Sequence, residues 1–468
     1  MKRLLFASIL LMFSEVGAQN AFFSNWLNSK VFKNASAGIM VYDLDNDSVL
    51  LTSNAEKNLV SASTLKIVTT ASSLKDLGPN FRFKTELAYT GTIQNSTLSG
   101  NLMINGFGDA TLGSKYFAED QKAFIHQWAE EVKKAGIIII EGDIIANDSY
   151  LGSSPAPYDW LWSDISNYYG SPARALNVFD NQYTISFSTK EAGSKAEITS
   201  ISPEIPYLKL HSTVKASEEQ KDNAYILGGP LEFSKEVEGT IPANRSAFKV
   251  KGAIPDPALM LAWLIFEELK SKGISVKGTY KSIREKPTEN GRVFYTHLSP
   301  ALKDIIAITN KQSNNLFAES CGAAVRMKNN AVDCQNNIEV SLKNCGFEQA
   351  LIKDASGLSP TNALSPKNFT LLLKTMYSDA TLFPVYKASL SLAGQDGTLK
   401  NFGGGQQFAG NFFGKSGSMT GIKSYAGYLK SSKGKNIAVV IMVNHYTSEN
   451  SAIKEKAEEL INYVYLNY

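Results

Sequence analysis

Near its start the chain contains Val60-Ser61-Ala62-Ser63-Thr64-Leu65-Lys66-Ile67-Val68, a pattern that predicts the first turns of a helix with a serine at its N-terminus. Residues three apart share a helix face, so the Lys66 amine can lie beside the Ser63 hydroxyl. The helix N-terminus adds unsatisfied backbone N–H groups and a partial positive charge. A hydroxyl next to an amine that can accept its proton is a candidate activated nucleophile.

The Ser-x-x-Lys spacing alone is weak support for this interpretation, because it occurs six times in the chain. The other five occurrences begin at Ser72, Ser212, Ser246, Ser432 and Ser451. A capped helix or a solvated turn explains such a spacing without any catalysis. The case for Ser63 must therefore come from the rest of the chain.

Bulk composition indicates a folded protein of two or three domains. The chain has 468 residues, of which 43% are hydrophobic, enough to build cores. Its 47 basic and 44 acidic residues leave a net charge of +3, which gives no support for a nucleic-acid partner.

The N-terminus has the pattern of a secretory signal peptide. Met1-Lys2-Arg3 precedes an apolar run from Leu4 to Phe13, and Val16-Gly17-Ala18 has the small residues of a cleavage site. We expect cleavage near Ala18. The apolar run is too short to span a bilayer, and no cysteine follows it for a lipid anchor. The sequence predicts a secreted protein without an integral membrane segment. It favours the periplasm as the location and leaves the outer cell wall open as the alternative.

The cysteines and histidines do not suggest a metal site. Cys321, Cys334 and Cys345 fall within 25 residues, and their odd number leaves one thiol unpaired in a monomer. A Cys334–Cys345 disulfide is weakly supported, and Cys321 is expected to be buried in a helix. The four histidines are scattered and form no His-Glu-x-x-His motif, so we expect neither metal nor cofactor.

Hydrophobic periodicity predicts that both ends of the chain build one sheet. Strands are expected near the N-terminus, over 37–42 and 49–52, and near the C-terminus, over 413–419, 425–429 and 437–443. Helices are expected after Ser63 and over 257–272, 302–309, 316–327, 369–377 and 449–465. The region from 81 to 277 has short alternating segments and many turns, which favour β structure. An antiparallel sheet from both chain ends, flanked by helices and interrupted by a β-rich insertion, accommodates all of this.

Three short motifs occur in order in suitable structural settings. Ser63-x-x-Lys66 begins a helix, Ser313-Asn314-Asn315 lies between two helical segments, and Lys415-Ser416-Gly417 lies on a strand before Ser418. This order resembles the serine-reactive penicillin-binding proteins and β-lactamases. The chemistry of amide opening assigns a role to each residue. Ser63 attacks, Lys66 is the base, Ser313 relays a proton and Asn315 holds the substrate amide.

The third motif and the oxyanion hole complete this interpretation. Lys415 supplies a positive charge that binds a substrate carboxylate and helps to keep Lys66 deprotonated. Ser416 and Gly417 line the strand along which the substrate lies. The backbone N–H groups of Ser63 and Ser418 form the oxyanion hole.

The large insertion resembles one branch of these enzymes. Ser63 and Ser313 are 250 positions apart, as in the D-Ala-D-Ala carboxypeptidase/endopeptidase family, peptidase family S13 of the DacB type. Flanking segments are similar to those of that family: 106–112, 160–177, 310–316, 354–359 and 393–399. Ser416 stands for the usual threonine, and Leu161 stands where some members carry an aromatic residue.

The resemblance implies a division into domains and a side-chain subsite. Residues 1–18 would be the signal peptide, 19–82 and 278–468 the catalytic domain, 83–108 and 183–277 one inserted domain, and 109–182 another. Asp164, Tyr169 and Met419 would lie near the amino end of the peptide side chain of the substrate. The fold class expected is α/β, with a transpeptidase/β-lactamase-like domain.

The function implied is a serine D-Ala-D-Ala carboxypeptidase and D,D-endopeptidase acting on peptidoglycan stem peptides, with β-lactams as covalent inhibitors. A β-lactamase is one alternative, although no clear glutamate motif between Ser63 and Ser313 would serve rapid deacylation. A non-catalytic peptidoglycan-binding protein of the same fold is another. The sequence leaves open a homodimer, the preference between carboxypeptidase and endopeptidase reactions, and the third residue of the stem peptide.

Overall fold

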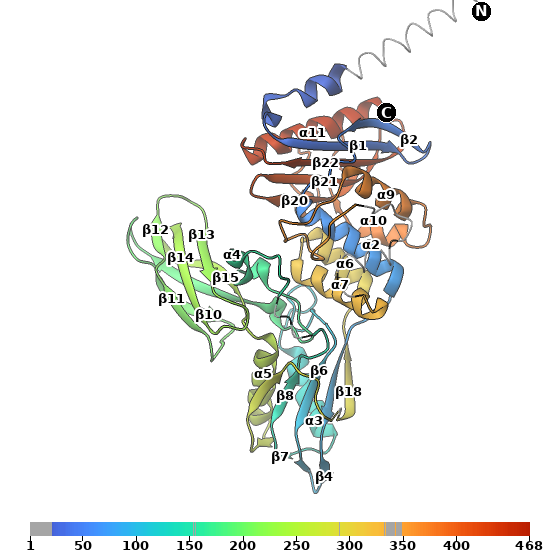
Figure 1. Ribbon diagram of the computed structural model, residues 1–468. Helices are drawn as coiled ribbons and strands as arrows, with labels where there is room; N and C mark the ends of the chain where they lie inside the picture. The colour runs from blue at the N-terminus through green and yellow to red at the C-terminus, as the bar shows by residue number, and fades with distance from the viewer. Residues whose placement is uncertain are drawn as a thin grey trace, which may run out of the picture.

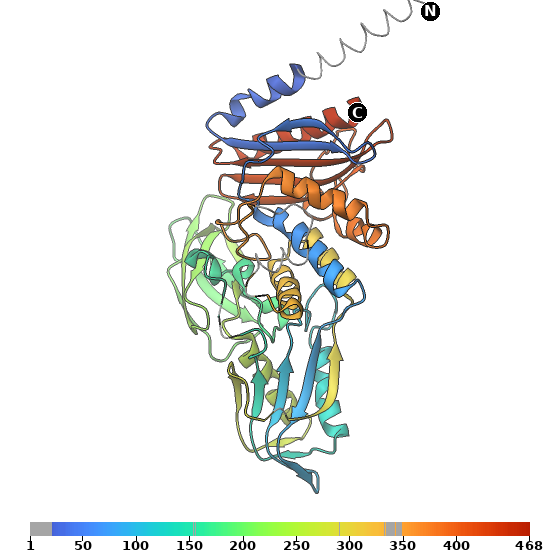
Figure 2. The same cartoon turned by 45° about the vertical axis from the view of Figure 1, so that its right-hand side comes forward.

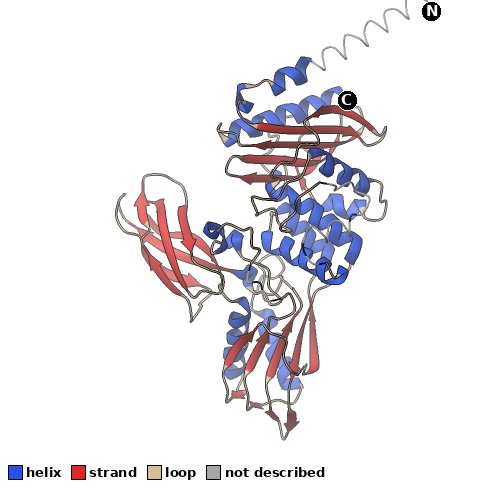
Figure 3. Cartoon of the chain, in the orientation of Figure 1, coloured by secondary structure: helices blue, strands red, loops and turns tan. Residues whose placement is uncertain are grey.

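The computed structural model describes residues 21–468, apart from 153, 155, 290, 332, 334–341 and 343–348. The expected signal peptide and the pair Cys334 and Cys345 lie outside the described residues. Both ends of the described chain lie in one body of sheet and helices, and two further lobes extend from its helical side (Figure 1, Figure 3). None of the helices in the described ranges is long and apolar enough to cross a membrane.

A six-stranded antiparallel sheet joins the two chain ends, as predicted. Its order is β19-β20-β21-β22-β1-β2. Its strands are β1 (Ser36–Asp43), β2 (Ser48–Ser53), β19 (Ser391–Leu392), β20 (Phe412–Met419), β21 (Ile422–Lys430) and β22 (Asn436–Asn444). The N-terminal strand β1 pairs along its whole length with β22, from Ser36 opposite Asn444 to Asp43 opposite Ile437. The mixed α/β class with antiparallel sheets is thereby confirmed.

β22 is buried on both faces, because a layer of helices covers each side of the sheet. Ile437, Val439, Ile441 and Val443 share a core with the inward face of α11 (Asn450–Asn467). The alternate residues Ala438, Val440 and Met442 share a core with α9 (Pro366–Tyr377) and α2 (Leu65–Leu77). Because successive side chains of a strand point to opposite faces, β22 contributes side chains to two hydrophobic cores. Burial of each larger aliphatic side chain stabilises the fold by about 1.5–3 kcal/mol.

The helix α2 is the central element of the layer below the sheet (Figure 2). It packs against α6 (Leu302–Lys311) and α7 (Asn315–Asn329), and α10 (Phe383–Ser389) closes the layer. Every residue from Leu65 to Leu74 is buried, including the polar ones. A helix buried all round can hold its side chains in fixed positions, since neighbouring helices contact each face.

The insertion leaves this body after α2 and forms two lobes. The first contains the five-stranded sheet β17-β8-β6-β3-β18, a short sheet β16-β7-β5-β4 and the helices α3 (Ala123–Lys134) and α5 (Pro257–Ser271). The strands of its two sheets are β3 (Lys84–Tyr89), β4 (Thr92–Gln94), β5 (Thr97–Ser99), β6 (Leu102–Gly106), β7 (Ile139–Ile140), β8 (Ile144–Asn147), β16 (Ser275–Val276), β17 (Tyr280–Ile283) and β18 (Arg292–Leu298).

The second lobe is built of strands alone (Figure 3). A three-stranded sheet β10-β9-β15 faces a four-stranded sheet of β11, β14, β12 and β13. Their bounds are β9 (Gln182–Thr189), β10 (Glu197–Ser202), β11 (Lys209–Ser212), β12 (Lys215–Ser217), β13 (Asn223–Leu227), β14 (Ser234–Pro242) and β15 (Arg245–Ala253).

Strand pairing groups the insertion differently from the expected domain boundaries. β8 pairs in parallel with β6, so residues 144–147 and 102–106 belong to one sheet. β18 pairs with β3, although residues 292–298 were expected in the catalytic domain. We propose that the first lobe comprises roughly residues 84–147 and 255–298, and the second roughly 182–253, with 148–181 as a connecting segment.

The Asn444 side chain attaches Val60, in the segment before Ser63, to the sheet. Asn444, at the end of β22 and 1% exposed, accepts a hydrogen bond from Val60 N at 2.7 Å and donates one to Val60 O at 3.0 Å. Asn444→Ala should lower the stability of the protein by roughly 2 kcal/mol or more, because both Val60 groups lose their partner. Thermal or urea unfolding would measure this loss.

Asn436→Ala is the matched control, at the opposite end of the same strand. Its side chain bonds to Asp45 in an exposed turn, so a change within about 0.5 kcal/mol is expected. Equal stabilities of the two variants would contradict the role assigned to Asn444.

Candidate active site

Ser63 lies in a short 3-10 turn, η2 (Ala62–Thr64), that leads directly into α2. Ser61, Ala62 and Thr64 are buried, whereas Ser63 is partly exposed. Thr64 Oγ1 and Ser424 Oγ each donate to the Ser61 carbonyl at 2.6 Å, which ties the turn to β21. The turn thus presents one serine toward solvent from an otherwise buried segment.

The Lys66 amine lies beside the Ser63 hydroxyl, as the helical spacing predicts. Lys66 Nζ is 3.0 Å from Ser63 Oγ. It is also 2.6 Å from Asn315 Oδ1 and 2.6 Å from the Ser356 carbonyl oxygen. These partners come from η2, α7 and a loop after residue 350, so distant parts of the chain meet at one amine.

The hydrogen-bond pattern directs the Lys66 lone pair at Ser63. The Asn315 amide nitrogen donates to the Tyr169 carbonyl at 2.8 Å, which fixes its oxygen toward Lys66. That oxygen and the Ser356 carbonyl can only accept. A neutral amine gives one N–H to each of them, and its lone pair is left for the Ser63 hydroxyl. The geometry therefore suits proton transfer from Ser63 Oγ to Lys66 Nζ.

Burial lowers the pKa of Lys66 to about 7, against the opposing charges of Asp354 and Glu319. The amine is fully buried, and a low-dielectric surrounding disfavours its charged form. From the sequence, we expect the charge of Lys415 to help keep Lys66 deprotonated. In the structure burial is the largest cause of the lowered pKa.

Ser313 and Asn315 lie at the junction of α6 and α7. The Ser313 backbone adopts a left-handed conformation, with φ of 54°, and Asn314 caps α7 by accepting from Phe317 N. This tight turn ends one helix and begins the next within three residues. Asn315 consequently reaches Lys66, and the partly exposed Ser313 lies two residues before it.

Lys415 lies on β20 and is fully buried. Its amine donates to the Ser416 carbonyl at 2.5 Å. Burial, and after it the charge of Lys66, lowers the pKa of Lys415 well below its usual value. A carboxylate that entered beside Lys415 would stabilise its charged form.

Gly417 marks where β20 approaches the nucleophile. A Cβ at this position would lie 2.5 Å from Ser61 O and 3.0 Å from Ser63 N. Only glycine allows so close an approach of two backbones. The strand thus lies close against the turn that carries Ser63, and Ser418 follows Gly417 on it. The oxyanion hole of Ser63 and Ser418 stays a prediction. Met419 ends the strand, opposite Ile422.

The loop that carries Asp164 and Tyr169 reaches the centre through Asn315. Asp164 lies in α4 (Trp162–Ile165) and Tyr169 in η3 (Tyr168–Gly170). Tyr169 donates its hydroxyl to Asp164 Oδ1 at 3.1 Å, and its carbonyl accepts from Asn315. Burial raises the pKa of Asp164, and the Tyr169 hydrogen bond opposes this. The two residues thus form a half-buried polar pair at the edge of the centre.

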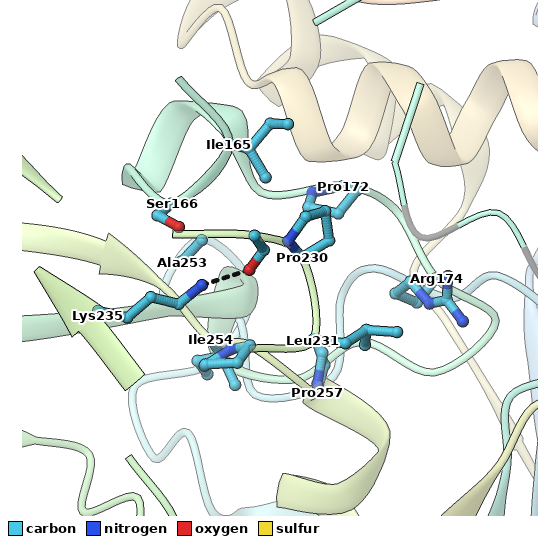
Figure 4. Close-up of a pocket in the computed structure, with 12 residues that line it drawn as sticks. Ile165, Ser166, Pro172, Arg174, Pro230, Leu231, Lys235, Ala253, Ile254 and Pro257 are labelled. Carbon is cyan, nitrogen blue, oxygen red and sulfur yellow. Dashed lines mark hydrogen bonds between the residues drawn. The ribbon is translucent and has the colours of Figure 1, made fainter. Parts of the chain in front are cut away.

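A small cavity of about 20 Å³ lies behind this loop (Figure 4). Among its lining residues are Ser166, Arg174 and the buried Lys235, whose amine donates to Gly229 O at 2.5 Å. None of the reactive residues lines it. Ser166 Oγ donates to the Gly228 carbonyl at 2.8 Å, so the second lobe supports the loop from behind.

Sequence reasoning missed several residues of the centre. Asp354 and Ser356 fall in a segment that the family resemblance includes, but without a role. Glu319 and Asn444 had no signal, because a glutamate within a helix and an asparagine after a strand are ordinary. Only the tertiary contacts give these residues a function.

Comparisons with known proteins show which family this chain belongs to. A model of the D-Ala-D-Ala carboxypeptidase 3 (S13) family matches residues 21–464. The D-alanyl-D-alanine carboxypeptidase DacB of Haemophilus influenzae is 25% identical, over 93% of this chain and 91% of its own length. The D-alanyl-D-alanine carboxypeptidase of Actinomadura sp. (strain R39) is 26% identical, over 90% of this chain and 80% of its own length.

Solved structures share the fold. Penicillin binding protein 4 (dacB) from Haemophilus influenzae matches with a TM-score of 0.82 at 23% identity, over 95% of this chain and 99% of that one. A predatory peptidoglycan endopeptidase from Bdellovibrio bacteriovorus matches with a TM-score of 0.50 at 16% identity, over 92% and 93%. With the family model matched over almost the whole described chain, this protein belongs to the D-Ala-D-Ala carboxypeptidase 3 (S13) family.

Proposed function

We propose that this protein is a serine D-Ala-D-Ala carboxypeptidase that acts on peptidoglycan stem peptides through an acyl-enzyme on Ser63. The contact of 3.0 Å between Lys66 Nζ and Ser63 Oγ carries this proposal, because it joins a partly exposed nucleophile to a buried base. The names of the Haemophilus and Actinomadura relatives support the reaction.

Acylation begins with attack of Ser63 Oγ on the carbonyl of the scissile D-Ala-D-Ala amide, while Lys66 accepts the hydroxyl proton. The Ser63 and Ser418 N–H groups stabilise the oxyanion, and loss of one such donor typically costs roughly 10²–10³ in rate. The C–N bond then breaks, and Ser313 relays a proton to the leaving amine. Water hydrolyses the ester and regenerates Ser63.

Substrate recognition is assigned to β20 and to the loop around Asp164. Lys415 binds the terminal carboxylate, and Ser416 and Gly417 lie along the peptide backbone. Asp164, Tyr169 and Met419 receive the amino end of the stem-peptide side chain. Asn315, expected to hold the substrate amide, contacts Lys66 and Tyr169 in the free protein. We assign it the additional task of orienting Lys66.

The same centre would cleave D,D cross-links, so we propose a D,D-endopeptidase activity as well. The shared fold of the Bdellovibrio peptidoglycan endopeptidase is consistent with this.

We also propose that β-lactams inhibit the protein. They would acylate Ser63, and the acyl group would be released slowly. The Haemophilus structure is also known complexed with a β-lactam. A β-lactamase would instead release the acyl group quickly, and a purely binding protein would not form it.

We propose that the protein acts in the periplasm after removal of its signal peptide near Ala18. Sequencing of the mature N-terminus of the exported protein would test the cleavage position. Retention of residues 1–18 would contradict it.

A homodimer stays a prediction, which sedimentation of the purified protein would test.

Ser63→Ala should abolish covalent labelling by a fluorescent penicillin and the release of D-Ala from a pentapeptide muropeptide. Ser432→Ala is the matched control, because Ser432 begins another Ser-x-x-Lys motif but is exposed and bonds only to the Tyr465 carbonyl. Mass analysis of labelled protein and of products from cross-linked muropeptides would measure both activities. Persistent labelling of the Ser63→Ala protein would refute the assignment.

The rate of acylation should fall as the pH decreases below about 7, where Lys66 becomes protonated and can no longer accept the Ser63 proton. On the acid limb a loss of about tenfold per pH unit is expected. Stopped-flow acylation by a fluorescent penicillin would give the profile, with circular dichroism at each pH to verify folding. A flat profile through this range would exclude Lys66 as the base.

Gly417→Ala should slow acylation by roughly 10- to 100-fold, because its Cβ would overlap Ser61 O and displace the turn that carries Ser63. Gly404→Ala is the control, since its Cβ has no neighbour within 4 Å. Acylation rates of the two variants would be compared at equal folded fractions. Unchanged acylation of Gly417→Ala would disprove the close approach of β20 to the nucleophile.

A further inference from the structure

The segment 354–359 lies directly behind the nucleophile, and the proposed reaction gives it no role. Thr69 of α2 donates to the Ala355 carbonyl at 2.6 Å. A Cβ on Gly357, whose φ is +79°, would lie 2.0 Å from the Ala62 carbonyl oxygen. A Cβ on Gly322 of α7 would lie 2.5 Å from that of Ala355. The segment is therefore wedged between α2, α7 and the turn of Ser63.

Two buried carboxylates hold the backbone of this segment. Asp354 accepts from Gly357 N at 2.8 Å, Ser359 N at 2.7 Å and the Trp160 indole at 2.9 Å. Glu319 of α7 accepts from Ala355 N at 3.1 Å and from Ser356 N at 2.8 Å through one oxygen, Oε1. Successive amides of a short loop thus point at acceptors, which fixes the direction of its carbonyl groups.

One of those carbonyl groups is a partner of the base. The Ser356 carbonyl accepts from Lys66 Nζ at 2.6 Å. Glu319 thus holds the N–H of Ser356, and the carbonyl of the same residue, across its Cα, accepts from Lys66, which contacts Ser63. The peptide group of that carbonyl also contains Gly357 N, which Asp354 holds. If the Ser356 carbonyl turned away, Lys66 would lose an obligate acceptor and could direct an N–H, instead of its lone pair, at Ser63.

We propose that Glu319 is a positioning residue for the general base: by holding the Ala355 and Ser356 N–H groups it keeps the Ser356 backbone in place, so that the Ser356 carbonyl can orient the Lys66 amine. Glu319 does not contact the reacting atoms. The inference rests on the proposed function, because it assumes that Lys66 accepts the Ser63 proton.

The charged surroundings of Glu319 are consistent with this role. Burial, and after it the charge of Asp354, raises the pKa of Glu319 to about 8. Lys66 faces it across the Ser356 peptide, and Lys415 lies beyond Lys66. On the outer side, Arg174, Arg326, Asp333 and Lys353 line a cavity with Glu319. Since acceptance of two N–H groups needs one oxygen and no charge, a glutamine can take over the task.

The experiment compares acylation by a fluorescent penicillin for wild type, Glu319→Gln and Glu319→Ala, over about pH 6 to about pH 9. Glu319→Ala should acylate roughly 10- to 100-fold more slowly than wild type. The acylation rate of Glu319→Ala should stay low even at the alkaline end of this range. Deprotonation of Lys66 would not restore the rate, because the Lys66 lone pair would point away from Ser63. Glu319→Gln should recover most of the rate, since its Oε1 still accepts from Ala355 and Ser356.

Asp256→Asn is the control for loss of a buried carboxylate, because Asp256 caps α5 in the insertion and does not contact the Lys66 network. Wild-type acylation by a folded Glu319→Ala protein would overturn the inference. A Glu319→Gln protein that folds but is as slow as Glu319→Ala would also overturn it, because the charge and not the acceptor would then matter. If Glu319→Ala does not fold, the acylation rate of Glu319→Gln decides: a folded Glu319→Gln protein that acylates slowly would overturn the inference.

Failure of the proposed function would be distinguishable. In that case the wild-type protein itself would form no acyl-enzyme, or Ser63→Ala would form one. A reactive wild type with an unaffected Glu319→Ala variant would refute only the positioning role.

Discussion

The burial of one amine is the constraint on which the rest of this structure depends. An ammonium group in a dry interior is costly, so Lys66 gains by being neutral, and a neutral amine has only two N–H groups to give. The Asn315 and Ser356 oxygens take both. The base therefore exists only while the helices around α2 exclude water and while acceptors from two other segments keep their direction. A shift of the helices around α2, of Asn315 or of the Ser356 carbonyl would therefore affect proton transfer from Ser63 to Lys66 even if Ser63 itself did not move.

The insertion is part of this constraint and not merely an appendage. Its connecting segment contacts the centre at two points: the Tyr169 carbonyl receives the Asn315 amide, and the Trp160 indole bonds to Asp354. Asn315 contacts the Lys66 amine directly, and Asp354 holds Gly357 N, in the same peptide group as the Ser356 carbonyl that accepts from Lys66. The loop that carries the proposed side-chain subsite is thus connected to the groups that orient the base.

Much of the catalytic body could be predicted from the sequence, because its signals are local. The period-two strands at the C-terminus and the Ser63 helix follow from residue pattern alone, and the spacing of Ser63 and Lys66 gave their contact. What could not be predicted depends on pairing between distant segments. The parallel contact of β8 with β6 involves only four residues each, so nothing in the sequence favours it over the expected division. Glu319 had no signal, since its value comes from two amides that arrive 36 and 37 residues later.

The pairing of β1 with β22 has a consequence for when the protein becomes reactive. β1 must find a partner about 400 residues further along the chain, and the Val60 segment must find Asn444. Such non-local closure is slow, because loop-closure entropy is lost before the contacts compensate for it. Translation of the N-terminal two thirds therefore yields a nucleophile without Lys415, without the sheet and without a dry base. With the function proposed above, we therefore expect Ser63 to become reactive only when the last strands enter the sheet.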